Sequence, residues 1–119
     1  MKLGKLYSMK KDFDQAQNMF KLAINIAKNE NDCSRLIDGL LEQGYAYKKQ
    51  KCITESIASL KKAEKIAHEN CLNRQEKAVV ELLADLAKEG HLSDFEAYTA
   101  RIYELDKAFR EHKEGVFNA

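Results

Sequence analysis

The sequence contains no proline and no tryptophan, and it has only five glycines. With no proline to break a helix and no alternating β-branched run to form strands, we expect an all-helical fold. Apolar runs all stay well short of the roughly 18 residues of a membrane-spanning helix, so no membrane association is expected. A net charge of +1, from 20 basic and 19 acidic residues, argues against nucleic acid as a partner of this chain.

The residue types that carry chemistry are also sparse. The three cysteines form no C-x-x-C pair, and the histidines at positions 68, 91 and 112 fall in three different predicted elements. The sequence has neither a glycine-rich phosphate loop nor a G-x-S-x-G nucleophile motif. We therefore expect no enzyme activity, no metal and no cofactor. Unpaired cysteines and the lack of a signal peptide favour a cytoplasmic location.

One stretch of the sequence, residues 3–27, returns forty residues later. Eight positions keep their size or apolar character at this single offset: Gly4/Gly44, Tyr7/Tyr47, Phe13/Ile53, Ala16/Ser56, Phe20/Leu60, Ala23/Ala63, Ile26/Ile66 and Ala27/Ala67. A fixed period of this kind is the signature of a repeat architecture.

The repeated unit resembles a tetratricopeptide repeat (TPR). The first unit carries the L-G-x-x-Y…A-x-x-x-F pattern in Leu3-Gly4-x-x-Tyr7 and Ala16-x-x-x-Phe20. The second unit departs from it, with Gln43 in place of leucine and with Ser56 and Leu60 at the later positions. The period exceeds the usual repeat of about 34 residues. It is similar to the extended repeats of Gram-positive peptide receptors, such as the Rap-type phosphatases and their transcription-factor relatives, and of animal GoLoco-motif scaffolds.

This resemblance implies a right-handed α-solenoid of three antiparallel helix pairs within a single TPR-like domain, 1–119. We expect six helices, at about 2–10, 13–29, 33–50, 53–69, 74–89 and from 93 onward. Repeat 1 covers about 1–30 and lacks its opening turn, and repeat 2 covers about 33–70. Repeat 3, at about 73–112, loses the small-residue pattern and is expected to be a divergent or capping unit.

Apolar positions at three- and four-residue steps predict which helix faces are buried. The second helix is expected to bury Phe13, Ala16, Phe20, Ala23 and Ala27, and the last helix Phe95, Tyr98, Ile102, Leu105 and Phe109. Gly44 costs about 1 kcal/mol of helix propensity relative to alanine. We therefore expect the partner helix to approach it closely.

The resemblance further implies that the first helix of each pair lines a concave peptide-binding surface. The opposite face from the core then supplies the candidate peptide-binding residues: Lys5, Ser8, Asp38, Leu41, Tyr45, Lys48, Glu81, Asp85 and Lys88. Lysines would meet acidic groups of an extended peptide, and Glu81 and Asp85 would meet basic ones. The simpler interpretation is that these are charges on an ordinary solvated face.

Three functions remain open at this level. The first is a protein- or peptide-binding module, the C-terminal part of a bacterial peptide-sensing regulator. The second is a structural adaptor or self-associating scaffold, a homodimer through its terminal helices. The third is a regulatory fragment of a Rap-like response-regulator phosphatase, whose catalytic contribution comes from a helical bundle outside this sequence.

Overall fold

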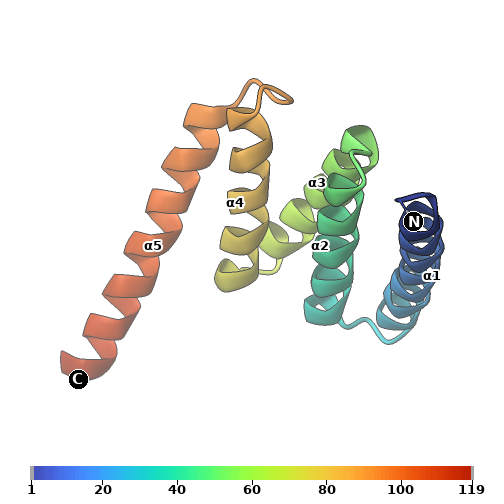
Figure 1. Ribbon diagram of the computed structural model, residues 1–119. Coiled ribbons are helices and arrows are strands. Elements are labelled where there is room, and N and C mark those ends of the chain that lie inside the picture. Colours follow the sequence, from blue (N-terminus) through green and yellow to red (C-terminus); the bar gives the residue numbers. More distant parts are fainter. Residues whose placement is uncertain (1, 119) are drawn as a thin grey trace.

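The computed structural model describes the backbone of residues 2–118 and the side chains of residues 12–111. The described backbone forms five helices and no strand, which confirms the all-α prediction (Figure 1). They are α1 (Lys2–Asn29), α2 (Cys33–Lys49), α3 (Ile53–Glu69), α4 (Asn73–Lys88) and α5 (Phe95–Asn118).

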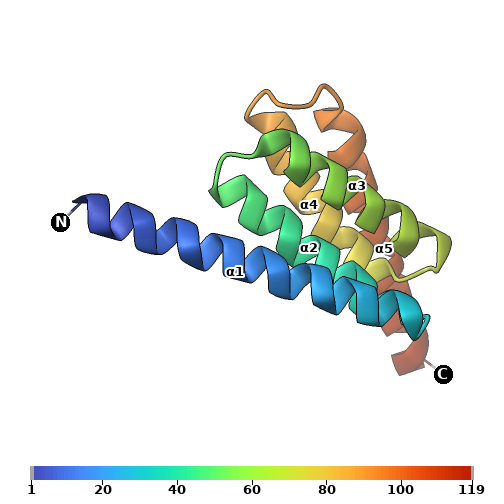
Figure 2. The same cartoon turned by 90° about the vertical axis from the view of Figure 1, so that its right-hand side faces the viewer.

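Helix α1 replaces two of the expected helices. The sequence predicts a break between residues 10 and 13, but the helix continues without interruption from Lys2 to Asn29. The residues at the expected turn, Lys10, Lys11 and Asp12, include neither glycine nor proline, so nothing in the local chain forces the helix to end there. The N-terminal end of α1 therefore extends away from the other helices (Figure 2).

The C-terminal ends of helices α1 to α4 share one geometry. In each, one residue adopts a positive φ: Asn31 (54°), Lys51 (61°), Cys71 (55°) and Gly90 (91°). The next residue donates its backbone N–H to a carbonyl five positions back, as in Asp32 to Ala27, Cys52 to Tyr47, Leu72 to Ala67 and His91 to Leu86, each at 2.9 Å. This is the Schellman closure of a helix C-terminus. These closures recur at steps of about twenty residues, but the turn that the forty-residue period would place near residue 11, as the counterpart of the turn at Lys51, is absent from α1.

Each helix packs on the next one along the chain, and α2 also contacts α4. Over the part of the chain that the structure describes, the backbones of α1 and α3 do not approach each other closely, and neither do those of α3 and α5. Helices α1 and α5 consequently lie at opposite ends of an elongated molecule measuring 60 × 36 × 23 Å (Figure 1).

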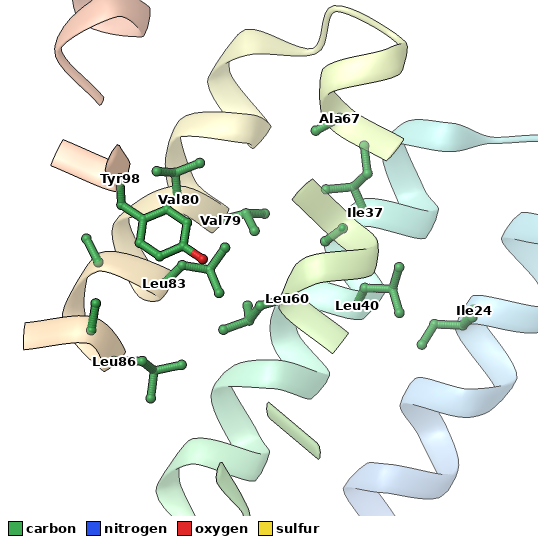
Figure 3. Close-up of a cluster of buried hydrophobic side chains, with 13 residues drawn as sticks. Ile24, Ile37, Leu40, Leu60, Ala67, Val79, Val80, Leu83, Leu86 and Tyr98 are labelled. Atoms are coloured by element: carbon green, nitrogen blue, oxygen red, sulfur yellow. The ribbon is translucent and has the colours of Figure 1, made fainter. Parts of the chain in front are cut away.

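The core runs through all five helices. Its largest fully buried aliphatic side chains are Ile37, Leu60, Val79, Val80, Leu83 and Leu86 (Figure 3). At Gly44 a Cβ atom would lie 2.8 Å from Leu60 Cδ2, and Ser56 Oγ donates a 2.6 Å hydrogen bond to the Gly44 carbonyl. The close approach expected at this glycine is therefore present.

Two residues assigned to the core from their spacing are exposed instead. Ala23 faces solvent because α1 packs only on α2, and Phe95, in the first turn of α5, is 40% exposed. The exposed side of α1 also carries Met19, Leu22 and Ile26. The other residues of these two predicted stripes are at least half-buried.

Candidate functional site

A groove of about 650 Å³ opens between α1 and α3, with α2 as its floor. It exists because α1 and α3 both pack on α2 while their own backbones do not approach each other closely. Its lining comes from all three helices: Lys21, Ile24, Asn25 and Lys28 of α1, Leu36, Leu40 and Gln43 of α2, and Lys62, Lys65, Ile66 and Glu69 of α3. A volume of this size is within the range of sites that bind ligands.

The deepest part of the groove is apolar. Ile24 and Leu40 belong to the buried core (Figure 3). Leu36 and Ile66 pack against that core while remaining partly open. Ile24 is held close to α2 because Gly39 has no side chain, and a Cβ there would lie 2.9 Å from Ile24 Cγ1. The floor is thus a fixed hydrophobic surface.

The rim of the groove is basic. Four exposed lysines, two on each wall, face one exposed carboxylate, Glu69, which gives a local charge of +3 (four minus one) against +1 for the whole chain. The ion pairs formed by the side chains of residues 12–111 involve none of these four lysines. Their charge is available to a ligand.

Two buried amides lie beside this floor. Gln43 is buried, and its Oε1 accepts a 3.1 Å hydrogen bond from Ser59 Oγ. Gln17 of α1 is 6% exposed, and neither amide atom of its side chain has a hydrogen-bond partner among the described residues. It precedes Lys21 by one helical turn on the same side of α1.

The packing register of α1 on α2 places these two amides together. The rings of Phe13 and Tyr47 stack edge-on with centroids 5.9 Å apart, and Ile24 meets Gly39 further along. Because the helices run antiparallel, this register brings Gln17 level with Gln43, although Gln17 itself does not line the groove. An unpaired buried amide is costly, so Gln17 is a donor and acceptor in need of a partner.

The peptide-binding residues predicted from sequence lie on a different surface, formed by α2 and α4. Asp38, Tyr45, Glu81, Asp85 and Lys88 are exposed, Leu41 and Lys48 are half-buried, and Lys5 and Ser8 lie outside the described side chains. Polar contacts join the two helices at both ends: Gln75 Nε2 donates to Asp38 Oδ1 at 2.8 Å, and Lys48 Nζ lies 3.4 Å from Glu89 Oε1. These contacts connect the α2 and α4 parts of the predicted surface, on which Tyr45 is 48% exposed beneath the ammonium group of Lys49.

The groove was missed because its lining residues belong to no single sequence motif. They are spread between positions 21 and 69 and meet only through the packing of three helices. The available signal was Gln43, which stands where the repeat pattern has leucine. A polar residue at a core position is a local departure that often marks a functional site.

A second polar cluster joins the last three helices. Buried Glu76 of α4 accepts two hydrogen bonds from Arg101 of α5, and His68 of α3 lies 3.2 Å from Arg101 Nη2. Burial alone would raise the pKa of Glu76, but the hydrogen bonds and charge of Arg101 more than offset this and lower it. Burial raises the pKa of neighbouring Glu64. Arg101 and Glu76 pair with each other beside His68, so the cluster links α5 to α3 and α4.

Comparisons with known protein families, curated proteins and solved structures give no significant match. Over its described range, the chain brings no three histidine, cysteine, aspartate or glutamate side chains together in a metal-binding arrangement. The same residues include no helix with the length and apolar character needed to cross a membrane.

Proposed function

We propose that this chain is a TPR-like helical-repeat module that binds a peptide or a segment of another protein. The forty-residue sequence period, the recurring closure of the helix C-termini and the sequential packing of the helices support a right-handed solenoid, with α2/α3 and α4/α5 as two of its helix pairs. In this proposal the chain contributes binding and no catalytic step.

The observation that carries the proposal is the groove between α1 and α3. It combines a fixed apolar floor with a rim of charged groups that have no partner in the chain. Apolar pockets with a few placed polar groups are the usual form of a ligand site. The surface of α2 and α4 around Tyr45 is the second candidate, favoured by the exposure of that aromatic side chain.

The resemblance to extended TPR proteins supplies the wider setting. It supports a place for the chain in the C-terminal part of a bacterial peptide-sensing regulator, or in a Rap-like response-regulator phosphatase. In either setting this chain would hold the ligand, and another part of the protein would carry the output.

The binding site can be tested with a phage-displayed library of random peptides, selected on the immobilised protein. Peptides recovered from it are then measured by fluorescence anisotropy against two matched variants. Asn25→Trp places a bulky ring in the groove, and Asn18→Trp places the same ring two helical turns away on an exposed part of α1 outside the groove. Tyr45→Ala tests the second surface.

We expect peptides that bind the wild type and Asn18→Trp equally and lose affinity for Asn25→Trp. Affinity that is lost in Tyr45→Ala and unchanged in Asn25→Trp would move the site to the α2/α4 surface. Failure to enrich any peptide would contradict the proposed function as a whole.

A further inference from the structure

We infer that the occupant of the groove is an amphipathic helix with an apolar stripe flanked by acidic residues. This inference rests on the proposed function, because it presumes that the groove binds a peptide segment. It names the conformation and the charge of that segment.

The walls of the groove favour a helical ligand over an extended one. One way in which an extended peptide gains affinity is by adding its backbone to an exposed sheet edge, and the described chain has no strand. The backbone groups of α1, α2 and α3 are bonded within their own helices. A helical ligand satisfies its own backbone in the same way, so it needs only side-chain contacts with the groove.

The apolar floor fits one stripe of such a helix. Ile24, Leu40 and Ile66 come from three different helices and surround the position where a fourth helix would lie. Packed helices approach to about 8–10 Å between their axes. A ligand helix resting on α2 would bury a narrow row of apolar side chains against these residues, since only one of its faces reaches the floor.

The lysines on the rim favour a ligand that carries acidic residues on both sides of its apolar stripe. Lys21 and Lys28 stand seven residues apart on one wall, and Lys62 and Lys65 stand on the other. Acidic residues on both sides of the apolar stripe would therefore each find a lysine, as flanking charges do in paired helices. The apolar floor favours this ligand over a nucleic-acid backbone, which would leave that floor uncovered.

Three synthetic peptides of equal length test the inference by fluorescence anisotropy. The first has a leucine stripe flanked by glutamates, the second has the same stripe flanked by lysines, and the third is the acidic peptide with a central proline that prevents a continuous helix. We expect the acidic helix to bind at least about tenfold more tightly than either of the others, and its affinity to fall as salt is raised.

Charge-reversal variants test whether the lysines of the groove cause the preference for the acidic peptide. Lys21→Glu/Lys65→Glu changes one lysine on each wall and should weaken the acidic peptide by about tenfold or more while improving the basic one. Lys51→Glu/Lys61→Glu makes the same change in net charge at exposed lysines outside the groove lining, and it should have a much smaller effect. Circular dichroism verifies that each variant is folded.

The outcomes separate this inference from the proposed function. If the acidic and basic peptides bind equally, or if the proline peptide binds as tightly as the acidic helix, the inference is overturned. The proposed peptide-binding groove still stands in that case if Asn25→Trp abolishes the binding. The inference also fails if none of the three binds while library-selected peptides do. If a single-stranded DNA oligonucleotide displaces the acidic peptide at equal concentration, the inference is overturned in favour of a nucleic-acid ligand. If neither the synthetic nor the library peptides bind, both proposals fail.

Discussion

Arg101 of α5 donates two hydrogen bonds to the buried carboxylate of Glu76 on α4, from Nε to Oε2 at 2.6 Å and from Nη2 to Oε1 at 2.9 Å. The planar guanidinium matches the carboxylate in a way that lysine cannot. Glu76 is only 2% exposed, so its charge depends on this partner. The pair connects the last helix to the rest of the fold.

Arg101→Ala is expected to lower the free energy of unfolding by about 2–3 kcal/mol, because it leaves a buried carboxylate unpaired. Urea denaturation measures the change. Arg110→Ala, on an exposed position of the same helix, should change stability by less than about 0.5 kcal/mol. The double variant Glu76→Met/Arg101→Met should recover much of the loss, since it removes both charges. If the single variant is as stable as the Arg110 control, the pair does not hold α5.

The same pair predicts a loss of stability in acid. Because Arg101 holds the pKa of Glu76 below its usual value despite burial, the charged form stabilises the fold. That contribution is complete above the unfolded pKa of about 4.3 and is lost as the pH falls through the lower folded value.

Urea denaturation from about pH 6 to pH 2 checks this, with the difference between wild type and Glu76→Gln isolating the pair from other groups. The stability advantage of the wild type should shrink below about pH 4. Glu42→Gln, at an exposed position of α2, serves as the control and should follow the wild type at each pH. A difference that stays constant down to pH 2 would contradict the assignment.

Gln17→Leu is expected to stabilise the free protein by about 1 kcal/mol, because it removes a buried amide that has no hydrogen-bond partner. The positions twenty and forty residues later are both isoleucine, Ile37 and Ile57, so an apolar residue suits this place in the repeat. The same variant should bind the acidic helical peptide as tightly as the wild type does, because Gln17 does not line the groove.

Thermal denaturation and anisotropy measure the two effects of this change. The neighbouring exposed Gln15→Leu should alter neither by much. A destabilised Gln17→Leu would show that the amide is already satisfied in the free protein.

Gly44→Ala is expected to destabilise the protein by about 1–3 kcal/mol through overpacking, and Gly44→Leu by more. An added Cβ would lie 2.8 Å from Leu60, which is fully buried and has no room to move. In a Leu60→Ala background the Gly44→Ala change should be nearly neutral, because the clash is gone. A double-mutant cycle in urea measures this coupling. Additive effects would mean that α2 and α3 do not meet at this point.

Helix periodicity and turn residues were enough to predict the central part of the fold from sequence. Helix α3 has the predicted bounds, and α2 and α4 each end one residue from theirs. Gly90 ends α4 as expected, since a glycine most readily takes the left-handed conformation. These features depend on interactions within a few residues, so a single sequence reveals them.

The first turn shows what local sequence leaves undecided. Lys11 and Lys51 are the same residue at equivalent repeat positions, yet Lys51 takes a positive φ and reverses the chain, while Lys11 continues a helix. Lys51 turns where α3 packs back on α2 through Gly44 and Leu60, whereas α1 continues straight and its outer face stays exposed. Packing, rather than residue type, decides between the two conformations.

The groove was likewise decided by tertiary structure. The sequence determined that Gln43 departs from the repeat pattern and that lysines are frequent in residues 21–65. Those residues surround a shared apolar floor only because α1 and α3 both pack on α2. The packing of the helices decides which residues of α1 and α3 lie close together, and a sequence period does not reveal that packing.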